Sequence, residues 1–306
     1  MGGPNNLDEV EIFLKNMFND ENIITVKSKL LRKLIAFTIT TMRKKEAVNN
    51  YKLLGGKSPL VENTEKLIKK LQNKENEAII TYAMRYTPPY SFDIIKQLIQ
   101  KKVTQIILIP LYPQYSTTTT KSSLDDFFQN VEKLRFKGEI NYSEKFYNNI
   151  LYNRAVIEQI KKTLNSANPK EYDLIFSAHS LPVKIIEKGD PYKQEVEKNV
   201  EILKNMLQKE QVEFNNIHIA YQSKLGPVEW LGPSLEEKLK SIENKKVILY
   251  PISFILDNSE TLYELHIEYA DIAKSLNFTD YLVCECINDS DIFINFLQSK
   301  IENLSK

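Results

Sequence analysis

Short apolar runs alternate with segments of helical periodicity along most of the chain. After each run comes a polar or proline-containing loop, and then a stretch with apolar residues every three or four positions, as in 91–102, 148–164 and 234–242. Runs that are apolar through their whole length are typical of parallel strands covered on both faces. The pattern predicts an α/β protein with strands at 78–84, 105–112, 173–179, 217–223, 246–253 and 281–287.

The order of strand-end residues repeats once along the chain. Tyr82 and Tyr221 lie 139 positions apart in similar settings, and Pro110 and Pro251 lie 141 apart. Two matches at nearly one spacing predict two similar α/β halves, 1–150 and 151–306. A ligand would then bind in a cleft between the halves, outside the carboxyl ends of the strands.

Aromatic, hydroxyl and a few ionisable side chains gather at these predicted strand ends. Such a rim suits a flat, mostly apolar ligand with polar edges. The segments that form it are 85–86, 112–123, 177–180, 221–233 and 254–260.

Composition narrows the class of protein. A chain of 306 residues with 42% apolar and 26% charged residues is typical of a globular protein, and its formal charge of +1 does not favour nucleic acid as a partner. No apolar run approaches the roughly 20 residues needed to span a bilayer, and the N-terminus lacks a secretory pattern. We therefore expect a cytoplasmic protein.

One local patch departs from this even charge balance. The segment Lys27–Lys45 contains seven basic residues, no acidic ones and an apolar middle, which predicts a basic amphipathic helix. Such a helix either packs on one side with a solvated outer face or forms a lip that meets a substrate or a membrane.

His179 is one of only three histidines and follows the predicted strand 173–179, while Pro182 ends the segment. An isolated histidine is often a satisfied structural residue, but one at the carboxyl end of a strand is also placed for chemistry. His218 falls within another predicted strand and His266 within a helix, so spacing alone predicts no cluster of metal ligands.

Three acidic residues follow the strand 246–253. Asp257 and Glu260 fit an N-cap with a capping box, which is a structural interpretation. Alternatively, Glu260 and Glu264 share one helix face with Asp257 at its start, and a row of carboxylates beside a pocket can guide a metal ion or carry protons.

Three further features each allow a structural or a functional interpretation. The run Ser116–Ser123 is either a capped helix start or an anion site, and it lacks the glycine pattern of a nucleotide site. Trp230 lies between two Gly-Pro pairs, where it packs on a helix or stacks near a planar ligand. Cys284 and Cys286 cannot complete a four-ligand metal site, and we interpret them as small strand residues.

At these residues the sequence resembles the ferrochelatase family, whose members insert ferrous iron into a porphyrin at the end of haem synthesis. The resemblance spans almost the whole chain in family order, and the motifs FSAHSLP with GDPY and SKLGPVEWLGP are its most specific parts. The other matching motifs are MGGPNNL, GGKSPL, MRYTPP, LYPQYSTTTTKSSL, PISFILDNSETLYELHIEY and CINDSDIF.

The resemblance implies two Rossmann-like halves, each with a parallel sheet flanked by helices, around a porphyrin cleft. It implies that His179 and Glu260 face the porphyrin and handle metal and protons jointly, with Glu264 and Asp257 forming an acidic trail behind them. It also implies a set of residues that line or orient the porphyrin: Met1, Arg85, Tyr86, Tyr112, Ser116 and Trp230.

The chemistry fits these residue types. Iron can enter a porphyrin only when two N–H protons leave and the ring puckers. A histidine poised near neutral pH and a carboxylate can accept those protons or deliver the metal. The iron is a substrate, so no resident cofactor is implied.

Three departures from the family pattern give further expectations. The family has a strand before the GGP loop, whereas this chain begins at Met1, so either the start is misassigned or the N-terminal half lacks its first strand. Asn258 replaces a frequent histidine, so a proton relay would use the acids. Two closely spaced cysteines do not match the cluster-binding set of some relatives, so we expect no iron–sulfur cluster.

We therefore predict a ferrochelatase acting as a lyase on protoporphyrin IX or a closely related porphyrin, monomeric, with peripheral contact to a membrane. The alternatives are a non-catalytic porphyrin or haem carrier on the same scaffold and, less in keeping with YPQYS and WLGP, a cobalt chelatase.

Overall fold

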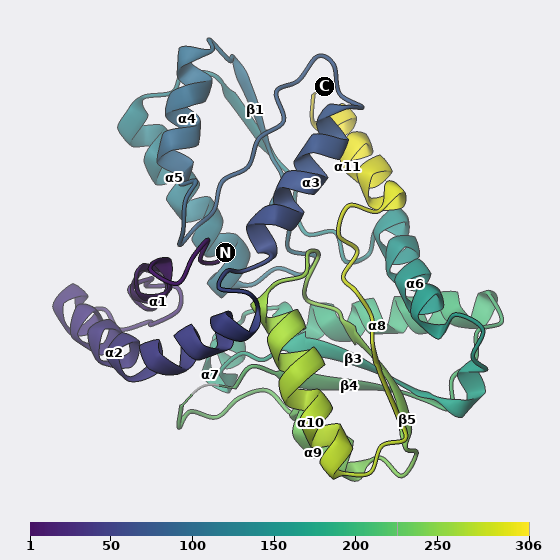
Figure 1. Cartoon of the computed structure of the whole chain (residues 1–306). Coiled ribbons are helices and arrows are strands. Elements are labelled where there is room, and N and C mark those ends of the chain that lie inside the picture. Colours follow the sequence, from purple (N-terminus) through teal and green to yellow (C-terminus); the bar gives the residue numbers. More distant parts are fainter. Residues whose placement is uncertain (225, 306) are drawn as a thin grey trace. The chain divides into compact units, whose positions relative to one another are not determined.

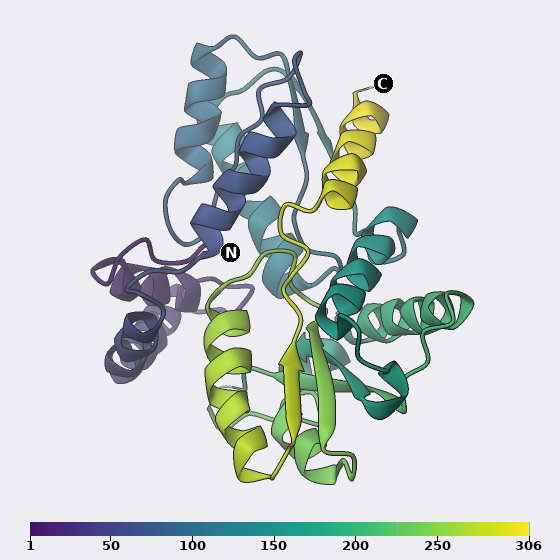
Figure 2. The same cartoon turned by 45° about the vertical axis from the view of Figure 1, so that its right-hand side comes forward.

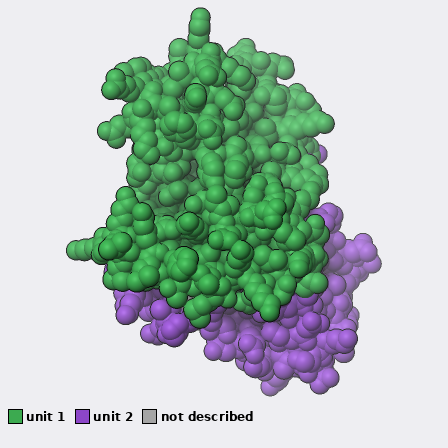
Figure 3. Space-filling view, turned by 60° about the vertical axis from the view of Figure 1, so that its left-hand side comes forward, with its two compact units in different colours: residues 1–111, 116–144, 297–306 green, residues 112–115, 145–296 purple. Residues whose placement is uncertain are grey.

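The computed structural model describes residues 1–224 and 226–305. The chain divides into two compact units, which Figure 3 shows in two colours. Unit 1 comprises Met1–Leu111, Ser116–Glu144 and Leu297–Lys306, and unit 2 comprises Tyr112–Tyr115 and Lys145–Phe296. The division into two similar α/β halves, 1–150 and 151–306, stays a prediction.

Unit 2 is built on a four-stranded, fully parallel sheet in the order β4-β3-β5-β6. Its strands are β3 (Asp173–His179), β4 (Asn216–Gln222), β5 (Lys246–Pro251) and β6 (Asp280–Val283). All of β3 except its last residue is buried, as expected for a central strand that is apolar through most of its length. The sheet therefore brings the carboxyl ends of β3, β4 and β5 to one edge.

Helices cover both faces of this sheet. On one face, α6 (Ile150–Leu164) contacts β5 and α8 (Tyr192–Lys209) contacts β4. On the other face, α9 (Leu235–Ser241), the π-helix η3 (Glu260–Glu268) and α10 (Tyr269–Ser275) pack on the strands, and Figure 2 shows α10 running alongside β5 and β6. The remaining elements are the 3₁₀ turn η2 (Pro169–Glu171), α7 (Val183–Glu187) and α11 (Asp291–Leu304).

Unit 1 has a smaller sheet in which β1 (Gln105–Leu108) pairs in parallel with β2 (Glu139–Tyr142). The helices α4 (Ser91–Gln100) and α5 (Ser122–Leu134) pack on it through a cluster that includes Ile95, Ile106 and Phe127. The other helices of the unit are α1 (Glu9–Phe18), α2 (Lys29–Leu53), α3 (Leu60–Gln72) and the π-helix η1 (Thr117–Lys121), and Figure 1 labels most of them.

The expected strands at 105–112, 173–179, 217–223, 246–253 and 281–287 are present, although β1 and β6 are shorter. The expected strand at 78–84 is wrong. In the described part of the chain this segment has no ladder partner, and the backbone N–H of Ile80 instead donates to Gln72 Oε1 at 2.8 Å. A strand needs a neighbour to satisfy its backbone groups, so apolar content alone could not produce one.

The strand β2 was not predicted. It has only four residues, and its apolar positions are too few to stand out from a loop. The basic segment Lys27–Lys45 does form a helix, as part of α2. In the described residues, no helix combines the length and apolar character required to cross a bilayer.

Candidate active site

His179 ends β3 and its backbone is fixed on both sides. The His179 N–H donates to Ser253 Oγ at 3.1 Å, and the Tyr192 hydroxyl donates to the His179 carbonyl oxygen at 2.9 Å. The Tyr192 and Ser253 hydroxyl oxygens lie 2.6 Å apart, so both belong to one network. The imidazole of His179 therefore projects from a rigid strand end and not from a loose loop.

Two glutamates on the π-helix η3 lie beside this ring. Glu260 Oε2 is 2.6 Å from His179 Nδ1, and Ser223 Oγ is 2.9 Å from Glu260 Oε2 and 2.6 Å from Glu264 Oε2. Ser223 follows directly after β4, so the sheet edge brings it to η3. The structure thus joins His179, Glu260, Ser223 and Glu264 in a continuous chain of hydrogen-bonding groups.

The charges in this chain determine where protons reside. Packing around His179 disfavours a charged ring, but the charge of Glu260 and its hydrogen bond outweigh this and raise the pKa of His179. Burial also opposes ionisation of Glu260, yet His179 outweighs burial and lowers the pKa of the Glu260 carboxyl. Burial, followed by the charge of Glu260, raises the pKa of Glu264 to about 8.

His179 and Glu260 therefore each favour the charged form of the other, and Glu264 holds its proton up to a pH of about 8. The side chains of His179 and Glu260 keep 34% and 33% of their area exposed, so a ligand can reach both. Across the described residues, no three His, Cys, Asp or Glu side chains are arranged to hold a metal ion. A metal that meets His179 and Glu260 would thus need further ligands from a substrate.

The N-cap interpretation of Asp257 is wrong. Glu260 N–H donates to Asn258 Oδ1 at 2.8 Å, so Asn258 caps the start of η3. The Asp257 carboxylate instead accepts hydrogen bonds from Thr261 Oγ1 at 2.9 Å and from Asn288 Nδ2 at 2.7 Å. Asp257 is 6% exposed, and its place in a proton trail stays a prediction.

In unit 1 the structure brings together Met1, Arg85 and Tyr86. The backbone N–H groups of Arg85 and Tyr86 donate to the Met1 carbonyl oxygen at 3.0 and 2.9 Å. Gly2 allows this contact, because its φ of +101° is left-handed and an added Cβ would lie 2.5 Å from Thr87 Oγ1.

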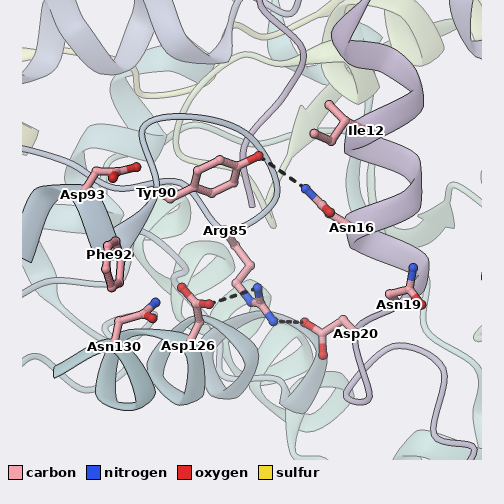
Figure 4. A pocket seen from close by; sticks show the side chains of 10 residues that line it. All are labelled: Ile12, Asn16, Asn19, Asp20, Arg85, Tyr90, Phe92, Asp93, Asp126 and Asn130. Atoms are coloured by element: carbon pink, nitrogen blue, oxygen red, sulfur yellow. Dashed lines mark hydrogen bonds and ion pairs between the residues drawn. The ribbon is translucent and has the colours of Figure 1, made fainter. Parts of the chain in front are cut away.

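Arg85 lines a cavity of about 570 Å³ that lies entirely within unit 1 (Figure 4). Its guanidinium pairs with Asp20 at 3.1 Å and with Asp126 at 3.2 Å. Tyr86 is fully buried and its hydroxyl donates to Asp20 Oδ2 at 2.8 Å. The geometry supports a role for Tyr86 in holding Asp20 and Arg85, and a direct contact with a porphyrin stays a prediction.

The predicted residues Ser116, Tyr112 and Trp230 lie in three different settings. Ser116 is 1% exposed and its hydroxyl accepts from Thr118 N–H at 3.1 Å, which supports the capped helix start. Tyr112 is half-buried in unit 2. Trp230 is half-buried, and its backbone pairs with Pro182, so its loop is tied to the segment that carries His179.

Four residues that contact the site were missed from the sequence: Tyr192, Gln222, Ser223 and Ser253. Each lies in or beside a motif that was noted. Gln222, Ser223 and Ser253 lie at or just beyond the end of a strand and Tyr192 begins a helix, so the signal that marks them is a polar side chain at those positions. Cys284 and Cys286 are both fully buried. Burial raises the pKa of Cys284 to about 12 and raises that of Cys286 as well, so both thiols stay protonated.

The fold first defines a class, that of α/β proteins with the architecture of SirB. The structure of SirB from Bacillus subtilis with Fe3+ matches with a TM-score of 0.58 over 79% of this chain and 88% of that chain. The sirohydrochlorin chelatase SirB from Bacillus subtilis subspecies spizizenii in complex with cobalt matches with the same score over 80% and 88%. Both are 11% identical in sequence, so this likeness concerns the fold, and it confirms the predicted fold class.

Sequence comparison then identifies the family. The Ferrochelatase family model matches residues 1–304. The ferrochelatase of a Nitratiruptor species is 54% identical over 97% of this chain and 95% of its own, and that of Campylobacter concisus is 49% identical over 99% and 95%. The chain belongs to the ferrochelatase family. It is a metal chelatase of the lyase class that inserts iron into a porphyrin for haem synthesis, and nothing supports the non-catalytic alternative.

Proposed function

We propose that His179 and Glu260 together handle the metal and the protons when ferrous iron enters the porphyrin. The observation that carries this proposal is the 2.6 Å contact between His179 Nδ1 and Glu260 Oε2, with both side chains about one third exposed. The ring can present its second nitrogen to the ligand while Glu260 compensates its charge. Glu264 and Asp257 act behind this pair.

Proton release is the step that this arrangement serves. Metal insertion removes two N–H protons from the porphyrin, so the site must accept protons close to where the metal binds. His179 and Glu260 are two titratable groups joined by a short hydrogen bond. Glu264 supplies a third group, whose pKa of about 8 lies near neutral pH. These groups can therefore exchange protons without a large energetic penalty.

The test is an anaerobic assay with ferrous iron and protoporphyrin IX. His179→Ala should lower kcat by at least about 100-fold, the lower range for a positioned acid–base group. His218→Ala is the matched control, because His218 also contacts a carboxylate, Asp173, at 2.8 Å but lies near the amino end of its strand. Unimpaired turnover in His179→Ala, or equal losses in both variants, would contradict the assignment.

Protoporphyrin IX is the proposed substrate, in keeping with the family's place in haem synthesis. Coproporphyrin III differs by carrying four carboxylates in place of two, so it would need more cationic partners. The ratio of kcat/KM for the two porphyrins decides between them, and a higher value for coproporphyrin would overturn this choice. No resident cofactor or iron–sulfur cluster is proposed, since the sequence has only the two buried cysteines.

We propose that the protein is a monomer in the cytoplasm and that it contacts a membrane peripherally through α2. The helix packs on α1 and exposes Leu30, Leu34 and Phe37 at 80%, 61% and 65%, residues spaced to share one face. Basic residues flank this face, as in helices that lie on anionic lipid. Exposed apolar residues grouped on one helix mark an interaction site.

Vesicle flotation tests this contact. The double variant Leu34→Ser/Phe37→Ser should lose most of its binding to vesicles that contain phosphatidylglycerol, and the native chain should bind less to purely zwitterionic vesicles. The matched control, Ile150→Ser/Val228→Ser, removes two comparably exposed apolar side chains from unit 2. Equal flotation of all three proteins would contradict the contact, and sedimentation analysis checks the monomer.

A further inference from the structure

The two glutamates of the site meet at one atom. Ser223 Oγ lies 2.9 Å from Glu260 Oε2 and 2.6 Å from Glu264 Oε2, both within hydrogen-bonding distance. Gln222 also reaches the cluster, but its amide donates to the Glu264 carboxylate and only to the backbone carbonyl of Glu260. The side chain of Ser223 thus contacts both carboxylates.

A hydroxyl group has one proton and two acceptor lone pairs. It cannot donate to two ionised carboxylates at once, so both contacts are hydrogen bonds only if one carboxyl carries a proton. Ser223 Oγ can therefore accept from a protonated Glu264 while it donates to Glu260, so that one hydroxyl contacts both side chains. His179 Nδ1–H donates to the Glu260 carboxylate from the other side.

The backbone conformation of Ser223 indicates that the position of its hydroxyl has a role. Its φ is +66°, in the left-handed region where residues other than glycine, asparagine and aspartate are uncommon. Glycine would adopt this conformation without strain, and yet a serine occupies the position. Serine adopts this conformation at an energetic cost, and in it the hydroxyl contacts two side chains of η3.

We propose that Ser223 is a positioning residue for metal insertion, whose hydroxyl holds the side chains of Glu260 and Glu264 in one fixed arrangement beside His179. The proposal rests on the proposed role of His179 and Glu260.

The substitution Ser223→Gly distinguishes the effect of the hydroxyl from the effect of the backbone conformation. Glycine removes the hydroxyl but relieves the left-handed conformation, so a purely structural role predicts a protein that is at least as stable and as active. If the hydroxyl links the carboxylates, kcat should fall about 10- to 100-fold while KM for the porphyrin stays within about twofold, because the loss concerns the chemical step.

Asn277→Gly is the matched control. Asn277 also has a left-handed φ, of +59°, at the exposed end of α10, and it takes no part in the site. This variant should keep the kcat of the native chain. Full kcat in Ser223→Gly, or an equal change in both variants, would overturn the proposal.

A double variant distinguishes a link from an independent contribution. Once Glu264→Gln has removed the partner carboxylate, the additional change Ser223→Gly should lower kcat by less than about threefold, since the link is already lost. Additive losses would also overturn the proposal. If His179→Ala keeps full activity, the proposed site itself fails, and that outcome is recognised separately from the behaviour of Ser223→Gly.

Discussion

Two clusters of charged side chains, one from each unit, differ in the cation that they contain. In unit 1, Arg85 lies between Asp20 and Asp126, and a guanidinium keeps its proton in proteins. In unit 2, the corresponding group is the titratable imidazole of His179, which lies beside Glu260. The pKa of the neighbouring Glu264 is raised to about 8. The cluster of unit 1 can fix a shape, whereas that of unit 2 can also exchange protons.

The local frameworks around the two clusters are alike. In each unit a π-helix follows a strand of the sheet: η1 follows β1, and η3 follows β5. The residues of η1 are threonines and a lysine, whereas η3 carries Glu260 and Glu264. π-Helical turns are often found at functional sites. The same backbone device therefore presents hydroxyls in one unit and acids in the other, and the side chains decide which unit holds the proton chemistry.

The largest expected effect is on turnover in unit 2. Glu260→Gln keeps the size of the side chain but removes the charge that pairs with His179, so kcat should fall by about 100- to 10,000-fold with a small change in thermal stability. Asp126→Asn makes the same chemical change beside Arg85 in unit 1. Initial rates and melting temperatures of both variants check the contrast, which fails if Asp126→Asn lowers kcat as much as Glu260→Gln does.

The next effect is on the stability of unit 1. Asp20 has a side chain only 1% exposed and accepts from Tyr86, Ser122 and Arg85. Asp20→Asn should lower the free energy of unfolding by about 2 to 4 kcal/mol, because it removes the buried negative charge beside Arg85 and one of the two oxygens that accept hydrogen bonds there.

Urea denaturation measures this loss. Asp93→Asn is the control, because Asp93 lines the same cavity from an exposed position, and its change should stay within about 0.5 kcal/mol. Losses of equal size in the two variants would show that the buried pairing of Asp20 is not what stabilises unit 1.

The sequence predicted most of unit 2 because its strands are buried on both faces. β3 is apolar over most of its length and ends near Pro182, so its extent and the place of His179 followed from the pattern. Unit 1 was harder, since the segment 78–84 has the composition of a strand, but in the described chain only Met84 pairs, in an isolated bridge with Tyr90. Strand formation depends on a partner that composition does not reveal.

Parts of the site could not be predicted for a related reason. The spacing of Glu260 and Glu264 indicated a common face, but Ser223 meets them from 37 and 41 positions away, through the edge of the sheet. The N-cap at Asp257 was wrong because Asn258 competes for the same N–H with a geometry that the sequence does not show. Contacts that the fold creates between distant segments are the ones that local patterns miss.

A third effect concerns the pH dependence of stability in unit 2. The raised pKa of Glu264 means that the folded protein keeps a proton which the unfolded chain loses above its ordinary pKa of 4.5. The stabilisation is fully present below that pKa and is lost as pH rises through about 8. Glu264→Gln cannot ionise, so its free energy of unfolding relative to the native chain should increase from pH 5.5 to 8.5, by about 3 kcal/mol.

Urea denaturation at several pH values measures this difference. Glu237→Gln serves as control, since the hydrogen bonds from Ser234 lower the pKa of Glu237 and leave it ionised in both states over this range. Its difference from the native chain should not vary with pH. A difference for Glu264→Gln that is equally flat would mean that Glu264 ionises freely in the folded protein.

The smallest expected effect compares the caps of the two π-helices. Ser116 Oγ accepts from Thr118 N–H in unit 1, and Asn258 Oδ1 accepts from Glu260 N–H in unit 2. Ser116→Ala and Asn258→Ala should each lower the free energy of unfolding by about 1 kcal/mol, the usual effect of losing a helix cap. Asn258→Ala should lower kcat more, because its cap also fixes the residue that pairs with His179.

Urea denaturation and initial rates on the same preparations provide both quantities. Equal losses of kcat would show that the position of the η3 backbone does not limit metal insertion, and the contrast between the units would then rest on their charges alone.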